Sequence, residues 1–191
     1  SLVVDSNDNP RIAYHDYTTK DLDYAWFDGT SWNLKVLDST GDTGHSISMA
    51  LTSVDDSLIS YIDNSGGPTS STLKLYNVSS DDFLSHDGFP GSRPNAGSEY
   101  IETGLAIDAL TGHPIVAYRG NDQVNNFFFH VDFGGELYGH AIESTTAGYI
   151  AMDSDSLGNL PVAWKKDNSA LKYKSDVRET DSESKKTVAS G

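Results

Sequence analysis

Four short segments decide the fold: Ile12-Ala13-Tyr14, Ile59-Ser60-Tyr61, Val116-Ala117-Tyr118 and Val162-Ala163-Trp164. Each places a β-branched residue, a small residue and an aromatic residue in that order, an alternation typical of a strand whose two faces differ. The aromatic residues recur at intervals of 47, 57 and 46 residues. A period near 45 residues is the length of one four-stranded β-propeller blade. We therefore interpret these anchor segments as equivalent strands of four blade repeats.

The sequence on either side of each anchor predicts the other strands of a blade. Short apolar runs rich in small residues come first, as expected of an innermost strand near the propeller axis. The other predicted strands are 1–5, 48–52, 104–108 and 149–153 before the anchors, 22–26, 73–76, 127–130 and 171–174 after them, and 32–39, 138–144 and 186–190 at the outer edge. Because no period of 3.6 residues stands out, we predict an all-β chain. Its four-stranded antiparallel blades span 1–46, 47–102, 103–148 and 149–191.

The repeats differ in two places, and four blades leave a propeller unclosed. Residues 79–100 are predicted to form a long loop that extends or replaces the outer strand of the second blade, and the polar segment 176–186 lengthens the fourth. The chain also starts inside strand-like sequence, which suggests a processed protein or a fragment. We expect one of three arrangements: a piece of a propeller of six to eight blades, two chains joined into an eight-bladed ring, or open stacking. Phe127-Phe128-Phe129 is apolar on both strand faces, which favours burial or a subunit contact.

The amino-acid composition limits the classes of partner that the chain can bind. The 191 residues include 28 acids against 13 bases, for a formal net charge of -15. This balance argues against nucleic acid and against anionic membranes, and it attracts cations. The chain has no cysteine, so disulfides and thiolate metal sites are excluded. No apolar stretch reaches 18 residues, so we expect no membrane insertion. The acidity agrees with an extracellular or cell-surface location.

The repeat unit resembles those of secreted bacterial and archaeal β-propellers of the sialidase-like type, which are related to the Asp-box repeat. The resemblance rests on the Asn-Pro turn, the Ile-Ala-Tyr anchor and Gly29-Thr30-Ser31-Trp32, which matches the end of an Asp-box. It implies a propeller of six to eight blades outside the cell. Ala25 and Phe27 stand where the Asp-box has serine and aspartate, and no motif links the arginines into a carboxylate-binding triad. Sialidase activity is therefore not carried over.

Aromatic residues are the candidate ligand-binding groups. Trp26, Trp32 and Tyr17 lie near predicted strand ends, where an exposed ring beside polar groups can stack on a sugar. Blade-to-blade packing is the alternative explanation. His15 and Arg119 directly follow the anchors of the first and third repeats, in a column that faces solvent or a groove. We include both as candidate ligand-binding residues.

Two aspartate-rich turns raise the question of calcium. Asp5 and Asp8 lie in one turn, and Asp153 and Asp155 lie in another, so that hard oxygen ligands alternate along the chain. No glutamate follows at the spacing of a calcium-binding loop, and Asx-turns explain the same composition. The six histidines show no metal-binding spacing and are predicted to be ordinary surface residues. Asn77-Val78-Ser79 is a glycosylation sequon.

These observations favour a non-enzymatic extracellular propeller that presents a binding surface to a glycan or a protein. No Gly-x-Ser-x-Gly motif occurs, and the sequence singles out no carboxylate pair for glycoside cleavage. The first alternative is a structural subunit that self-associates into a filament, ring or sheath. The second is a fragment of a sialidase-like hydrolase or lyase whose catalytic residues lie in other blades. No cofactor other than Ca²⁺ is expected.

Overall fold

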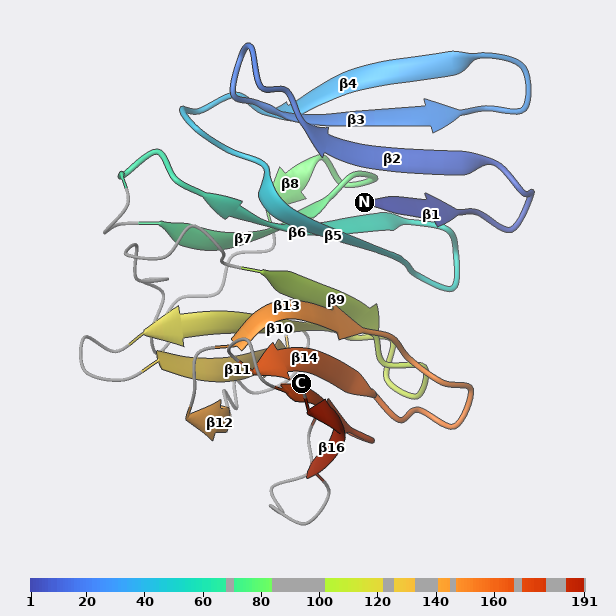
Figure 1. The fold of residues 1–191 in the computed structure, drawn as a ribbon. Helices are drawn as coiled ribbons and strands as arrows, with labels where there is room; N and C mark the ends of the chain where they lie inside the picture. The colour runs from blue at the N-terminus through green and yellow to red at the C-terminus, as the bar shows by residue number, and fades with distance from the viewer. Residues whose placement is uncertain are drawn as a thin grey trace.

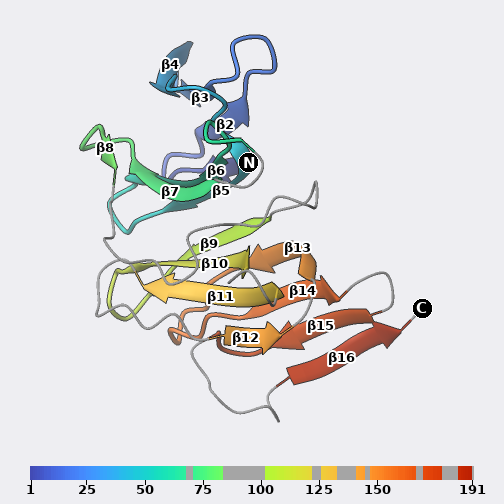
Figure 2. The same cartoon turned by 90° about the vertical axis from the view of Figure 1, so that its left-hand side faces the viewer.

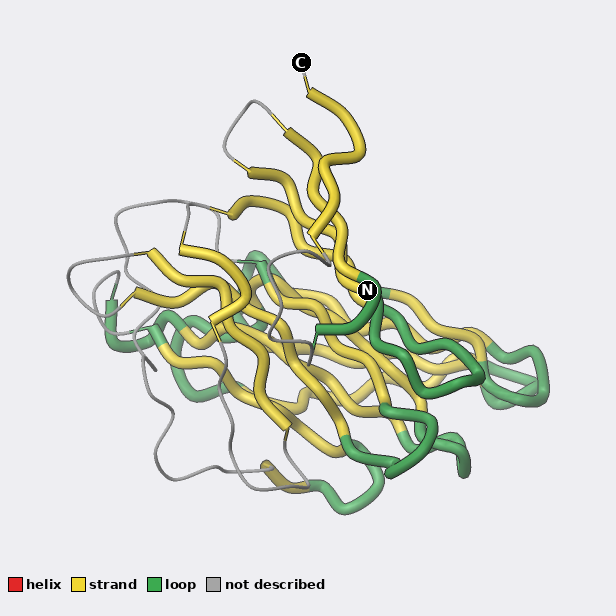
Figure 3. The backbone as a smooth tube through the Cα atoms, turned by 90° about the horizontal axis from the view of Figure 1, so that it is seen from below, coloured by secondary structure: helices red, strands yellow, loops and turns green. Residues whose placement is uncertain are grey.

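Every regular element that the computed structural model describes is a β-strand (Figure 1 and Figure 3). The structure describes residues 1–67, 71–83, 102–121, 126–132, 141–144, 147–166, 170–177 and 185–190. Its strands form four separate four-stranded sheets, each an antiparallel meander in sequence order. The prediction of an all-β chain built from four-stranded blades is therefore confirmed. In the described ranges there is no helix long and apolar enough to cross a membrane.

The four sheets are called blades 1 to 4 in chain order. Blade 1 contains β1 (Leu2–Val4), β2 (Pro10–His15), β3 (Leu22–Phe27) and β4 (Trp32–Asp38). Blade 2 contains β5 (His45–Leu51), β6 (Ser57–Asp63), β7 (Thr72–Asn77) and β8 (Asp82–Phe83). Blade 3 contains β9 (Thr103–Ile107), β10 (Pro114–Asn121), β11 (Asn126–Asp132) and β12 (Ala141–Ser144). Blade 4 contains β13 (Ala147–Met152), β14 (Val162–Lys166), β15 (Ala170–Lys174) and β16 (Lys185–Ser190).

The two segments that distinguish the second and fourth repeats in the sequence lie largely outside the described residues. The outer strand of blade 2 is only the two-residue β8, and residues 84–100 of the predicted long loop lie outside the described residues. Most of the polar segment before β16 also lies outside them. The backbone of Phe127, Phe128 and Phe129 belongs to β11, but their side chains are not among those described. The prediction of a buried or intersubunit phenylalanine run therefore stays a prediction.

The blades stack face to face (Figure 2), and the anchor segments form the contacts between them. Ala13 of β2 packs in one cluster with Ile59 and Tyr61 of β6, and Ala117 of β10 packs with Val162 and Trp164 of β14. The small central residues of the anchors in blades 1 and 3 thus face the following blade, whereas the two larger anchor residues in blades 2, 3 and 4 face the preceding blade. Because side chains alternate across a strand, the anchor sets the packing on both faces. The buried Tyr61 and Trp164 are fully shielded from solvent.

The innermost strands β1, β5, β9 and β13 line a shared hollow of about 380 Å³. Gly104 of β9 shows why the sequence uses small residues here. A Cβ at this position would lie 3.1 Å from Ile150 Cγ2 and 3.2 Å from Met152 Cβ of β13. The inner strands of blades 3 and 4 therefore approach too closely for a larger side chain, as the predicted position near the axis requires.

One face of blade 1 has no blade against it among the described residues. By the register of the sheet, Ile12 and Tyr14 lie on this face, whereas Ala13 faces blade 2. The open face carries a group of apolar side chains that are at least one-third exposed: Leu2, Val4, Tyr14, Trp32, Leu34 and Val36. It is the equivalent of the faces that blades 2, 3 and 4 turn toward the blade before them.

Candidate functional site at the junction of blades 1 and 2

Five polar or aromatic side chains gather where blade 1 meets blade 2, and we call them the junction site. His15 is the last residue of β2, and His45 is the first residue of β5. Tyr17 and Lys20 belong to the loop between β2 and β3, and Asp42 belongs to the connection between β4 and β5. Ligand atoms of His15, Asp42 and His45 all lie within 4.8 Å of one another.

The connection between β4 and β5 is held firmly against the β2–β3 loop. Thr43 is fully buried; its amide donates to the Lys20 carbonyl at 2.9 Å and its hydroxyl donates to the Asp38 carbonyl at 2.7 Å. The same hydroxyl accepts the Leu22 amide at 3.1 Å. Gly44 follows with φ +77, a left-handed conformation that glycine adopts without strain, and a Cβ there would lie 3.0 Å from Leu22 Cα. The chain is thereby turned so that His45 comes beside His15.

Hydrogen bonds orient both imidazole rings. His15 Nδ1 lies 2.7 Å from the Thr43 carbonyl oxygen. A carbonyl only accepts, so Nδ1 carries the proton and the Nε2 lone pair of a neutral His15 is left free. His45 Nε2 lies 2.8 Å from Asp42 Oδ1, and the two rings have centroids 4.4 Å apart at 34°. The junction site therefore holds two adjacent imidazoles and one carboxylate in a defined arrangement.

Asp42 is the negative member of the junction site. Burial acts to raise its pKa, but the hydrogen bond from His45 and the nearby charges of His45 and Lys20 outweigh burial and lower the pKa below the usual value. Lys20 Nζ lies 3.7 Å from Asp42 Oδ2 on a largely exposed side chain. The carboxylate is therefore ionised at neutral pH and is accessible from solvent.

Tyr17 forms an exposed ring at the edge of the junction site. Its exposed fraction is 91%, the highest among the large hydrophobic side chains that the structure describes as exposed. The ring meets His15 edge-on, with centroids 6.3 Å apart and planes at 88°. An open aromatic face beside histidine, lysine and carboxylate groups offers apolar stacking and hydrogen bonding together.

The other predicted ligand-binding residues lie elsewhere. Trp26 is half-buried, stacks on Tyr24 at a centroid distance of 5.4 Å and packs against the cluster between blades 1 and 2. Trp32 begins β4 at the far end of blade 1, tilted against Phe27 at 5.8 Å, with its ring on the open face. The backbone of Arg119 occupies in β10 the position that follows the anchor, as His15 does in β2, but its side chain is outside the described residues.

Asp42 and His45 were not predicted as site residues. His15 and His45 are far apart in the sequence, and no metal-binding spacing connects them. A signal was present in the repeat itself, because His15 closes the second strand of one blade and His45 opens the first strand of the next. The centroid distance of 4.4 Å between the two imidazole rings shows that these two strand ends lie side by side.

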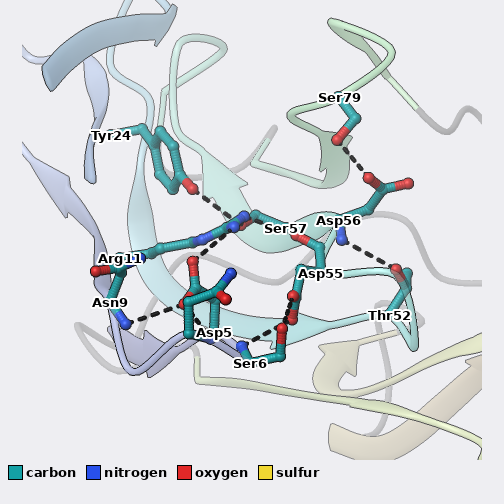
Figure 4. A network of polar contacts seen from close by, with 11 residues as sticks. Asp5, Ser6, Asn9, Arg11, Tyr24, Thr52, Asp55, Asp56, Ser57 and Ser79 are labelled. Carbon is teal, nitrogen blue, oxygen red and sulfur yellow. Dashed lines mark hydrogen bonds and ion pairs between the residues drawn. The ribbon is translucent and has the colours of Figure 1, made fainter. Parts of the chain in front are cut away.

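The aspartates predicted for calcium lie in turns between the first two strands of blades 1 and 4. Asp5 Oδ1 accepts the amides of Asn7 and Asn9, both at 2.9 Å, and Asp5 Oδ2 accepts Arg11 Nη2 at 3.0 Å (Figure 4). Burial acts against these donors, yet they lower the pKa of Asp5, with the Asn9 amide as the largest cause. These contacts are those of an Asx-turn, the alternative to calcium binding that the sequence also suggested.

The turn of blade 4 is built in the same way. Asp155 Oδ1 accepts the amides of Leu157 and Asn159 at 2.9 and 2.8 Å. Asp153 accepts the amide of the next residue at 2.8 Å. Asp8 has φ 61, the left-handed conformation required at its place in the first turn. Calcium binding at these four aspartates stays a prediction.

Arg11 is a link between blades 1 and 2 at the opposite end from the junction site. Its Nη1 donates to the Asp55 carbonyl at 2.6 Å and to Ser57 Oγ at 3.2 Å, as Figure 4 shows. Ser6 donates to the Asp55 carboxylate from its amide and its hydroxyl, at 3.2 and 2.5 Å. These contacts connect the two blades, and they leave Arg11 committed to a structural role.

Asn77, the residue of the predicted glycosylation sequon, ends β7. Its Oδ1 accepts the amides of Ser79 and Ser80 at 2.9 and 3.2 Å and so forms the turn toward β8. Modification of Asn77 stays a prediction.

No protein-family model matches the chain, and no curated protein matches its sequence. Solved structures resemble it in fold. The Dos1 propeller matches with a TM-score of 0.55 and 15% identity, over 100% of this chain and 46% of that one. The intramolecular trans-sialidase from Ruminococcus gnavus, in complex with oseltamivir carboxylate, matches with a TM-score of 0.50 and 8% identity, over 87% of this chain and 38% of that one. A fucose lectin from Kordia zhangzhouensis, in complex with methyl-fucoside, matches with a TM-score of 0.49 and 15% identity, over 73% of this chain and 96% of that one.

The four stacked sheets and the likeness to the Dos1 propeller define the class of the protein: it is a segment of β-propeller blades. At such low identity the likeness concerns the fold alone. A sialidase-type structure among the neighbours agrees with the predicted type of repeat at the level of the fold. The chain spans 46% of the Dos1 propeller chain and 38% of the trans-sialidase chain.

Proposed function

We propose that the protein is a non-enzymatic, extracellular β-propeller segment that binds a glycan at the junction site. The observation that carries this proposal is the Tyr17 ring, which is 91% exposed and rests edge-on against His15 beside Asp42, His45 and Lys20. Tyrosine presents a rigid amphipathic face at low entropic cost, and an exposed ring of this kind stacks on the apolar face of a pyranose. The surrounding imidazole, ammonium and carboxylate groups supply donors and acceptors for the sugar hydroxyls.

Binding is favoured over glycoside cleavage by the state of the nearby carboxylates. Cleavage commonly uses two carboxyl groups, one of which acts as an acid with a raised pKa. Asp42 instead pairs with His45 and Lys20, and its pKa is lowered. Asp16, next to His15, accepts the amides of Thr18 and Thr19, which lower its pKa as well. Neither group has the character of a general acid.

A glycan array tests the proposal. The 191-residue chain should bind a restricted set of glycans, and Tyr17→Ala should lower the affinity for the best of them at least about tenfold, which corresponds to about 1.4 kcal/mol. Trp32→Ala is the matched control, because it removes an exposed aromatic ring at the other end of blade 1. Binding that survives Tyr17→Ala and is lost in Trp32→Ala would move the site to the other end of the blade. No binding to any glycan would end the proposal.

A second candidate function is assembly with another copy of the chain, and the open face of blade 1 favours it. Leu34 is 72% exposed and Val36 is 53% exposed on an outer strand of the sheet. In the three junctions inside the chain, the equivalent face is covered by the preceding blade, which contributes the small residue of its anchor: Ala13 and Ala117 pack in apolar clusters, and Ser60 hydrogen-bonds Thr103. The outer face of blade 4 could cover blade 1 in the same way. Ala163, the small residue of its anchor, pairs with Tyr173 of β15, and Leu171 of β15 is 42% exposed. We infer that blade 4 of a second copy covers blade 1.

Light scattering on the isolated chain decides between this assembly and a monomer. A two-fold ring of eight blades would give twice the chain mass of 20.7 kDa, and Leu34→Asp should shift it to the monomer because the charge would be buried in the contact. Lys20→Asp serves as the control, since it also changes a surface charge on blade 1 but at the junction site. A monomer at high protein concentration would overturn the assembly proposal and would indicate that the face is covered in another way.

A further inference from the structure

We propose that His15, Asp42 and His45 bind a divalent transition metal ion of the zinc class. The three side chains present two imidazoles and one carboxylate whose ligand atoms lie within 4.8 Å of one another. This donor set is common for Zn²⁺ and suits Cu²⁺, Ni²⁺ and Co²⁺ as well, whereas Ca²⁺ and Mg²⁺ prefer oxygen ligands only. The inference does not depend on glycan binding, because it rests on the ligand set alone.

The geometry is close to that of a loaded site. Two ligand atoms at about 2.0 Å from a tetrahedral zinc ion are about 3.3 Å apart. His45 Nε2 and Asp42 Oδ1 are already 2.8 Å apart, so their hydrogen bond would open slightly as the proton on Nε2 gives way to the metal. Bringing the ligand atom of His15 from the 4.8 Å limit to that separation requires a movement of at most about 1.5 Å. The movement required is that of side chains at the solvent-facing edge of two strands.

The surroundings of His15 match those of a metal-binding histidine. Such residues usually donate their second ring N–H to a carbonyl or carboxylate, which fixes the tautomer and the orientation of the ring. His15 Nδ1 is bound to the Thr43 carbonyl at 2.7 Å, and Thr43 is itself fully buried and tied to three other backbone groups. His15 Nε2 is therefore the nitrogen that is left for a metal.

Electrostatics favour a cation at this place. The chain carries a net charge of -15, and one of the three ligands at this place is the Asp42 carboxyl group. Among the lysine and arginine side chains that the structure describes, Lys20 pairs with Asp42; the contact is long at 3.7 Å and the Lys20 side chain is 61% exposed. Lys20 can swing into solvent when a metal binds. Three protein ligands leave a fourth position of a tetrahedral zinc ion for water or for an oxygen of a ligand.

Isothermal titration of the chelator-treated chain with Zn²⁺ tests the site. We expect saturable binding of one ion per chain, and the same site should take Co²⁺ with the visible absorption of a tetrahedral complex. His15→Ala and His45→Ala should each weaken binding more than tenfold, since outer-sphere changes alone cost 10- to 100-fold. His113→Ala is the matched control, because His113 lies in the turn between β9 and β10 of blade 3 and should leave the affinity unchanged.

A second pair of variants guards against a loss of folding. His45→Gln and Asp42→Asn keep the size and hydrogen-bonding capacity of each side chain, and their circular dichroism and unfolding midpoint in the absence of metal should match those of the parent chain. Lys20→Met should tighten Zn²⁺ binding by removing the competing cation. The proposal is overturned if the parent chain shows no saturable binding, or if His113→Ala weakens it as much as His15→Ala does. Failure of the glycan array leaves this result unaffected.

Discussion

Asp38 is a buried carboxylate at the junction of blades 1 and 2, and its removal should destabilise the fold strongly. Its exposed fraction is 4%, and Oδ2 accepts the Tyr61 hydroxyl at 2.6 Å and Lys74 Nζ at 2.9 Å. Oδ1 accepts the Thr40 amide at 3.1 Å. Asp38→Ala removes all three contacts and leaves the Tyr61 hydroxyl without its acceptor inside the junction.

The magnitude follows from what each partner loses. A buried donor left unsatisfied costs about 1–3 kcal/mol, and breaking a buried ion pair costs about 3–5 kcal/mol. In the variant, Lys74 keeps its ion pair with Asp63 at 2.8 Å, and its side chain is 25% exposed. The Lys74 charge is therefore still partly compensated, and the lower end of the range for a broken buried ion pair applies. We expect Asp38→Ala to lower the free energy of unfolding by about 3 kcal/mol, and Tyr61→Phe to lower it by about 1.5–3 kcal/mol, the amount typical of a hydrogen bond to a charged group.

Urea unfolding followed by circular dichroism measures these changes. The double variant Asp38→Ala/Tyr61→Phe should lose less than the sum of the two single variants, because both remove the same hydrogen bond. Lys35→Ala is the control: Lys35 also crosses between blades, to Asp81 at 2.6 Å, but that ion pair is exposed and contributes little. If Asp38→Ala is no more destabilising than Lys35→Ala, or if the losses of Asp38→Ala and Tyr61→Phe are additive, the reasoning is refuted.

Two further predictions concern pH and the packing of the inner strands. Burial would raise the pKa of Asp38, but hydrogen bonds from Tyr61, Lys74 and Thr40 outweigh it and lower the pKa below 3.8. The contribution of Asp38 to the free energy of unfolding is therefore complete above pH 3.8, and it is lost as the pH falls through the lower pKa that Asp38 has in the folded state. Acid titration of stability should show a loss in the parent chain that is smaller in Asp38→Asn. Gly104→Val should shift the urea midpoint downwards, since even the Cβ would lie within 3.3 Å of the β13 backbone; an unchanged midpoint would mean that blades 3 and 4 are not packed as closely as described.

The fold could be predicted because the deciding information is local and repeated. The sequence of each anchor predicts both the strand and the residues that pack on each of its faces, because side chains alternate along a strand with a period of two. The same rule explains why Trp26 and Trp32 were grouped by sequence but are separated in space. Trp26 faces blade 2, whereas Trp32 pairs with Phe27 on the opposite face of the sheet. Of the three aromatic residues placed near predicted strand ends, Tyr17 and Trp32 are exposed, whereas Trp26 is half-buried.

The junction site could not be predicted in the same way, because no single repeat contains it. His15 takes its position from the Thr43 carbonyl, and Thr43 belongs to the connection that leads out of blade 1. His45 comes beside His15 only because Gly44 turns the chain at φ +77. These are contacts between residues that are distant in sequence, held by one hydroxyl and one glycine. The repeat places His15 and His45 at adjoining strand ends, but it does not predict the turn that brings their side chains together.

The junction site and the buried network around Asp38 are joined through one residue. The Thr43 hydroxyl donates to the Asp38 backbone carbonyl, and the Thr43 carbonyl accepts from His15. The Asp38 side chain meanwhile binds Tyr61 and Lys74 of blade 2. The orientation of His15 therefore depends on how blades 1 and 2 are packed. Because of this dependence, binding of a ligand or metal at the junction site would also stabilise the contact between the two blades. Because each blade supplies only part of this arrangement, two adjacent blades are the smallest unit that can carry the site, and the stability of their contact sets how well the site is formed.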